Sequence, residues 1–102
     1  MSGQTDRTER IREMEDALNE CLEAFDGMAR QMDRMEALRE RMIRLFRYYG
    51  SAEWFDDREA ELPTDLRAGI LSEDAGYDLL TAARDTAFRM LEQGTDILKN
   101  RI

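Results

Sequence analysis

Few residues in this sequence are equipped for catalysis. Histidine, the commonest general base and transition-metal ligand, is absent. The single cysteine, Cys21, cannot form an internal disulfide, and no glycine-rich phosphate loop occurs. We therefore predict that the protein is not an enzyme and carries no cofactor.

Carboxylates are the one chemically capable group that gathers in one region. Residues 51–78 hold nine acids and two bases, whereas residues 1–50 hold eleven acids and nine bases, so most of the net charge of −8 lies in the middle of the chain. Three interpretations stay open: a solvated surface, which we favour, a docking patch for a basic partner, and a cation site. Hard cations prefer oxygen ligands, but the spacing does not match a calcium-binding loop, and we predict no metal site.

Aromatic residues gather in the same region. Six of the eight fall between residues 46 and 77: Phe46, Tyr48, Tyr49, Trp54, Phe55 and Tyr77. They would form either a small core that holds this connector over the helix ends or a patch that faces a partner, since Tyr and Trp are frequent in binding hot spots. On the second interpretation, the candidate protein-binding residues are Trp54, Phe55, Asp56, Asp57, Glu73, Asp74 and Tyr77.

The apolar spacing indicates which elements position these residues. An uninterrupted heptad pattern, here called the seam, follows the first part of the chain: Ile11, Met14, Leu18, Cys21, Phe25, Met28, Met32 and Met35. A second consecutive step of three residues leads from Met35 to Leu38. This irregularity in the heptad pattern is a stammer, and the pattern then continues to Tyr49. We predict one long helix over residues 6–49, with Cys21 a buried core residue rather than a reactive thiol.

Asp26-Gly27 is a turn dipeptide and would suit a break in this helix. The seam keeps its phase across Gly27, and a glycine inside a helix costs only about 1 kcal/mol relative to alanine. A helix that continues through Gly27 is therefore favoured over a helix that breaks there.

Residues 50–71 form the acidic, aromatic connector. Gly50 suits the left-handed backbone conformation of the residue that ends a helix. Ser51 suits the N-cap position of a short helix over 52–60, and Pro63 ends that helix. Ser72 then caps a C-terminal helix over 72–101, where Glu73 and Asp74 suit the helix dipole. Small and apolar residues form one stripe on this helix: Gly76, Leu80, Ala83, Ala87, Met90, Gly94 and Ile97.

These elements predict an all-α fold with a single domain over residues 1–102. The C-terminal helix would pack antiparallel to the long helix in a helical hairpin or bundle, with the seam and the stripe face to face. Two helices give a thin core, so we also expect two chains to pair as a homodimer with coiled-coil character.

Cellular context and partners follow from charge and hydropathy. The sequence shows no signal peptide at its start and no apolar run of the ~20 residues that span a bilayer, so the cytoplasm is the expected location, with no membrane association. The net negative charge disfavours direct binding of nucleic acid. The arginines at 39, 41, 44 and 47 would be counter-charges for the connector.

We predict an interaction or regulatory protein that presents its connector to a protein partner. The alternative is an acidic inhibitor that mimics nucleic acid and blocks a basic groove.

The connector also carries a recognisable pattern: Tyr48-Tyr49-Gly50-Ser51, Trp54, Asp57, Leu62-Pro63, Asp65-Leu66, Gly69, Leu71-Ser72-Glu73-Asp74, Tyr77 and Leu79-Leu80. The chain thereby resembles the bacterial family DUF4298, a domain of unknown function. The resemblance implies a short, stand-alone helical bacterial protein, and it implies no activity and no functional residues.

Overall fold

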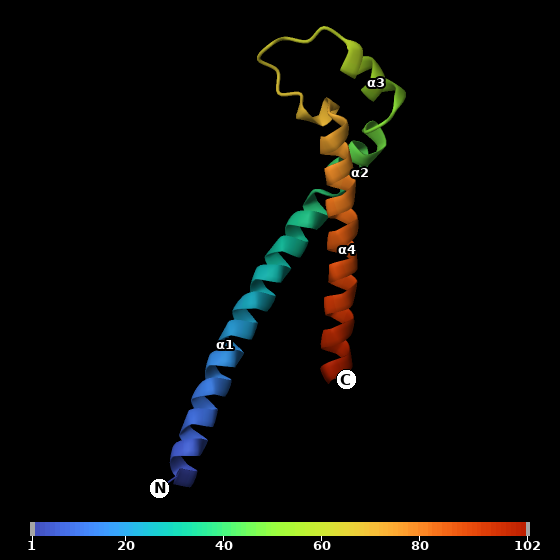
Figure 1. Ribbon diagram of the computed structural model, residues 1–102. Helices are drawn as coiled ribbons and strands as arrows, with labels where there is room; N and C mark the ends of the chain where they lie inside the picture. The colour runs from blue at the N-terminus through green and yellow to red at the C-terminus, as the bar shows by residue number, and fades with distance from the viewer. Residues whose placement is uncertain (1, 102) are drawn as a thin grey trace. The chain divides into compact units, whose positions relative to one another are not determined.

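Residues 2–101 are described by a computed structural model (Figure 1). They form four α-helices, one short 3-10 helix and no strand: α1 Ser2–Ala37, α2 Arg39–Tyr48, α3 Ala52–Glu59, η1 Gly69–Leu71 and α4 Glu73–Arg101. This confirms the all-α class. The chain divides into two compact units, Met1–Arg41 and Met42–Ile102, and each is described by itself. The two outermost residues of the predicted domain, 1 and 102, lie outside the described part.

The first unit consists mainly of α1, which starts four residues before the predicted start and runs through Gly27 without a break. The interruption lies instead at Leu38, where the stammer falls. The N–H of Leu38 donates to the carbonyl oxygens of Arg34, at 3.0 Å, and Met35, at 3.2 Å. Such a shared bond tightens the last helical turn. The helix predicted over 6–49 is therefore two helices, α1 and α2.

The seam of α1 is exposed, although we expected it to be buried. Ile11 and Met14 are both 60% exposed, and Leu18 and Phe25 are also exposed. Cys21 is exposed as well, so the described chain by itself does not bury it as predicted. The physical reason is that one helix cannot bury its own apolar stripe, and the first unit holds no second long helix to cover it.

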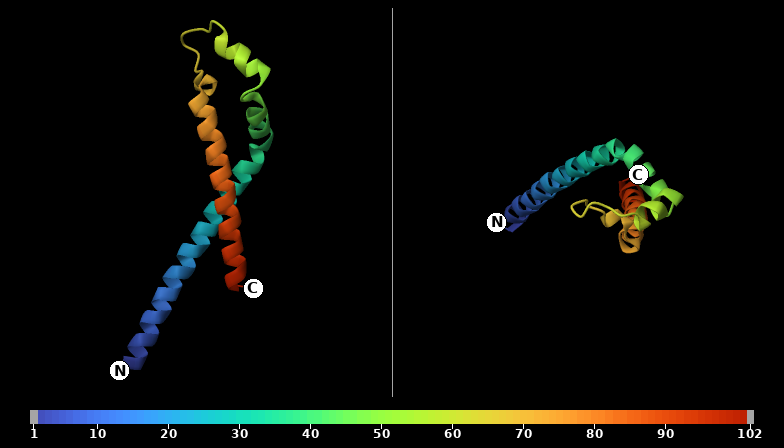
Figure 2. Two further views of the ribbon diagram at one scale, coloured as in Figure 1. Left: turned by 45° about the vertical axis from the view of Figure 1, so that its right-hand side comes forward. Right: turned by 90° about the horizontal axis from the view of Figure 1, so that it is seen from above.

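The second unit, here called the head, is a helical hairpin with a folded tip. Gly50 ends α2 with a φ of +79°, in the left-handed region. The Ser51 hydroxyl accepts a bond from the Trp54 N–H at 3.2 Å, and the Ser72 hydroxyl accepts one from the Ala75 N–H at 2.9 Å. Both predicted caps are thus present, and α3 ends at Glu59. The chain then turns back, so that α4 begins near the end of α2 (Figure 2).

The interior of the head is small. Trp54 and Gly76 are buried, and further residues in α2, just after it and in α4 are half-buried: Met42, Leu45, Phe46, Tyr48, Tyr49, Ala75, Leu79, Ala83 and Met90. Leu79 takes the inward position that the predicted stripe gave to Leu80, which is exposed. The head is therefore held by few contacts, and each of them matters.

Candidate functional site

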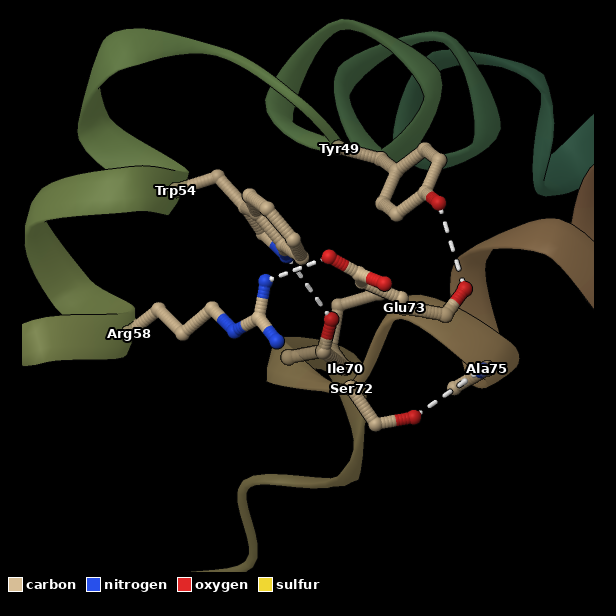
Figure 3. Close-up of polar contacts among 7 residues, drawn as sticks. All are labelled: Tyr49, Trp54, Arg58, Ile70, Ser72, Glu73 and Ala75. Carbon is tan, nitrogen blue, oxygen red and sulfur yellow. Dashed lines mark hydrogen bonds and ion pairs between the residues drawn. The ribbon is translucent and has the colours of Figure 1, made fainter.

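Trp54 lies at the centre of the head and is only 2% exposed. Its ring lies edge-on to Tyr49, with 5.3 Å between centroids, and to Phe55, with 4.9 Å. Its indole Nε1–H donates to the carbonyl oxygen of Ile70 at 2.9 Å (Figure 3). Because a buried N–H needs a partner, this bond fixes α3 against the 3-10 turn that precedes α4. Trp54 is therefore a structural residue of the head and is not offered to a partner.

Glu73, the first residue of α4, joins three elements (Figure 3). Its carbonyl oxygen accepts a bond from the Tyr49 hydroxyl at 3.2 Å. Its carboxylate pairs with the Arg58 guanidinium at 3.0 Å, and that guanidinium lies 5.1 Å from the centroid of the Trp54 ring. The ion pair is solvent-exposed and contributes little energy by itself. It joins α3 to the first residue of α4, with the Arg58 guanidinium lying over the Trp54 ring.

Asp57 is also used within the head. Its carboxylate accepts a hydrogen bond from the Tyr48 hydroxyl at 2.6 Å. This bond, helped by desolvation and by the negative charges of Asp57 and Glu53, raises the pKa of Tyr48 to about 12. Protonated Tyr48 therefore ties the end of α2 to α3 at neutral pH.

The other predicted site residues face outward. On α3, Phe55 touches the Trp54 ring edge-on and is still 52% exposed, whereas Asp56 lies about 200° around the helix from Trp54 and is exposed. On α4, Asp74 and Tyr77 lie away from the buried Gly76; Tyr77 is 68% exposed. Each helix thus presents one aromatic ring beside carboxylates: Asp56 and Glu59 on α3, and Asp74 and Asp78 on α4.

The structure therefore divides the predicted site into two groups. Trp54, Asp57 and Glu73 hold the head together, whereas Phe55, Asp56, Asp74 and Tyr77 form what we call the outer set. Sequence reasoning missed Arg58 and the Ile70 carbonyl, because their roles depend on contacts between distant segments. In the described part of the chain, Arg58, itself in the connector, pairs with Glu73 of α4. The four arginines predicted as counter-charges, 39, 41, 44 and 47, form no ion pair there.

Two further features bear on the possible chemistry. Within residues 2–101, no three acidic or other ligating side chains come together as a metal site would require. None of the helices described there has the combination of length and apolarity needed to cross a membrane.

Comparison with known proteins identifies the family. A family model described as a domain of unknown function, DUF4298, matches residues 11–93, which is most of the chain. The chain therefore belongs to this family, which confirms the resemblance seen in the connector. Neither a curated protein nor a solved structure matches the chain.

Proposed function

We propose that this member of the DUF4298 family is a non-enzymatic, cytoplasmic interaction protein whose head binds a basic segment of a partner protein. The binding surface is the outer set, Phe55 and Asp56 on α3 with Asp74 and Tyr77 on α4. The observation that supports this most is the contrast between neighbouring residues: Trp54 is 2% exposed, whereas the adjacent Phe55 is 52% exposed. The buried ring stabilises the head, and the Phe55 ring, which touches it edge-on, keeps about half of its surface open to a partner.

The chemistry of the outer set suits lysine or arginine side chains. An aromatic face attracts a cation, and the adjacent carboxylates accept charge-assisted hydrogen bonds from it. Residues 51–78 carry a net charge of −7, from nine acids and two bases, and this field would draw a basic segment toward the head. Because the head orders α3 and α4 in advance, binding would cost little further conformational entropy.

Quantitative pull-down from cells tests the proposal. The binding variant is Phe55→Ala with Tyr77→Ala, and the matched control is Phe88→Ala, since Phe88 has the same side chain as Phe55 and is 53% exposed. A specific partner should be recovered by wild type and by the control, and at least about tenfold less by the binding variant, as is typical of an aromatic hot spot.

The partner should then be purified, and its affinity measured with increasing salt. Replacement of Asp56 and Asp74 by Asn should weaken binding and flatten its salt dependence, since two contacts with the basic segment lose their charge. Recovery of the same partners by wild type, binding variant and control would contradict the proposal.

A further inference from the structure

The N-terminal half of the seam is an exposed apolar face. Ile11 and Met14 are both 60% exposed, Leu18 is 51% exposed, and Cys21 is exposed as well. The first unit consists mainly of α1, so no second helix within that unit covers these side chains.

This part of the seam has the heptad spacing of a coiled coil. Ile11 and Leu18 occupy position a, and Met14 and Cys21 occupy position d. Ile11 is a β-branched residue at position a, as in parallel two-stranded coiled coils. All four side chains are exposed in the described chain, and a row of large exposed apolar side chains marks an interaction surface.

The flanking residues indicate what covers this surface. Arg10 lies at position g and Glu15 at the next position e, with Ala17 and Leu22 at the following g and e positions. In a parallel, in-register pair of α1 helices, Arg10 of one chain faces Glu15 of the other on both sides of the seam. Neither residue forms an ion pair within the described chain. The remaining flank, Ala17 with Leu22, is apolar.

An antiparallel pair over the same residues is less favourable. When Ile11 faces Cys21 and Met14 faces Leu18, equivalent flanking positions face each other. Glu15 then meets Glu15 of the other copy, and Arg10 meets Ala24. Like charges in facing flank positions oppose association, and such charges set the orientation of coiled coils.

We infer that a second copy of this chain binds the N-terminal half of α1, as a parallel, in-register dimer over Arg10 to Leu22. The Arg10–Glu15 pairs between chains fix the register, and the two Cys21 side chains share one layer of the seam. This interface is separate from the outer set of the head, so the dimer and the proposed function can fail independently.

Charge exchange on the full-length chain tests the orientation. Sedimentation equilibrium should give twice the 11.9 kDa chain mass. Arg10→Glu or Glu15→Arg alone should weaken the dimer by roughly tenfold, because each reverses two ion pairs. A mixture of these two variants should form heterodimers in preference to homodimers, and the double exchange should restore wild-type affinity. Circular dichroism checks that helix content stays constant.

Cys21 supplies an independent test of register. Diamide should join the two chains through a Cys21–Cys21 disulfide, since it accepts the two hydrogens that the thiols lose. The control, Cys21→Ser with Asp16→Cys, puts the thiol on the outer face of α1 and should stay unlinked in an otherwise identical dimer. A monomer across the micromolar to millimolar range would overturn the inference. So would a dimer in which Cys21 stays unlinked and charge exchange has no effect.

Discussion

The ring of Tyr49 occupies the space that a Cβ atom on Gly76 would fill. A Cβ built at Gly76 overlaps three carbon atoms of that ring, and the hydroxyl of the same ring bonds to the Glu73 carbonyl. The missing side chain at Gly76 thus lets α2 approach α4 closely enough for this bond to form. Close approach of helices over small residues is a general device, and here one aromatic ring depends on it.

Gly76→Ala should therefore destabilise the head, although alanine is the better helix former. Overpacking of this kind costs about 1–3 kcal/mol, which exceeds the gain of about 1 kcal/mol from helix propensity. The matched control is Gly94→Ala in the same helix, where nothing lies within 4 Å of the new Cβ and stability should rise slightly.

Urea unfolding followed by tryptophan fluorescence measures both variants, and Tyr49→Leu in the Gly76→Ala background should recover part of the loss by removing the overlapping ring. If Gly76→Ala and Gly94→Ala had the same effect, the contact between Tyr49 and Gly76 would not exist in solution.

Trp54→Phe should cost about 1–2 kcal/mol beyond the loss of ring area. Phenylalanine keeps a ring between Tyr49 and Phe55 but has no N–H to donate to the Ile70 carbonyl. A buried acceptor that loses its hydrogen-bond donor lowers the free energy of unfolding by about this amount. Circular dichroism with urea gives the free energy of unfolding. Phe55→Leu is the comparison, because Phe55 is about half-exposed and its replacement should change stability by no more than about 0.5 kcal/mol. Equal losses for both variants would place Trp54 outside the core.

Tyr48 should make the stability of the head depend on pH above neutrality. The protonated hydroxyl donates to Asp57, so folding favours the protonated form and raises the pKa from 10.0 to about 12. This contribution is complete below pH 10 and is lost as pH rises through about 12. Ultraviolet titration of tyrosinate should show one of the three tyrosines ionising last, and Tyr48→Phe should remove that step.

Asp57→Ala should move the same step back toward the ordinary range of tyrosine, since it removes both the acceptor and the charge. Three tyrosines that titrate together near 10 in the wild-type chain would show that the bond between Tyr48 and Asp57 is not formed.

Local features of the head were predictable from the sequence because their causes are local. Gly50, Ser51 and Ser72 act through their own backbone conformation or through bonds three residues away. The stammer at Leu38 marked where the long helix is interrupted, although its phase shift alone did not predict a break. Continuity through Gly27 followed from the unchanged phase of the seam.

Non-local features were not predictable, because periodicity does not state which segments meet. The bond from Trp54 to Ile70 joins residues sixteen positions apart, and the choice of Leu79 over Leu80 for the inward position depends on how Tyr49 sits on α4. The aromatic set was expected to be either core or surface, and the structure divides it, with Trp54 inside and Tyr77 outside. The cover of the seam could not be assigned from the sequence, because apolar periodicity indicates a face to be covered, not which chain covers it.

The central claim is that the connector packs around Trp54 inside the head. The chain has a single tryptophan, so its indole N–H gives one resonance in a nitrogen–proton NMR spectrum, and its exchange with deuterated water reports on that site alone. Bonded to Ile70 and buried, it should exchange at least about a hundredfold more slowly than the indole of free tryptophan. Exchange at the rate of free tryptophan would contradict the structure of the head and the outward placement of Phe55 and Tyr77 that depends on it.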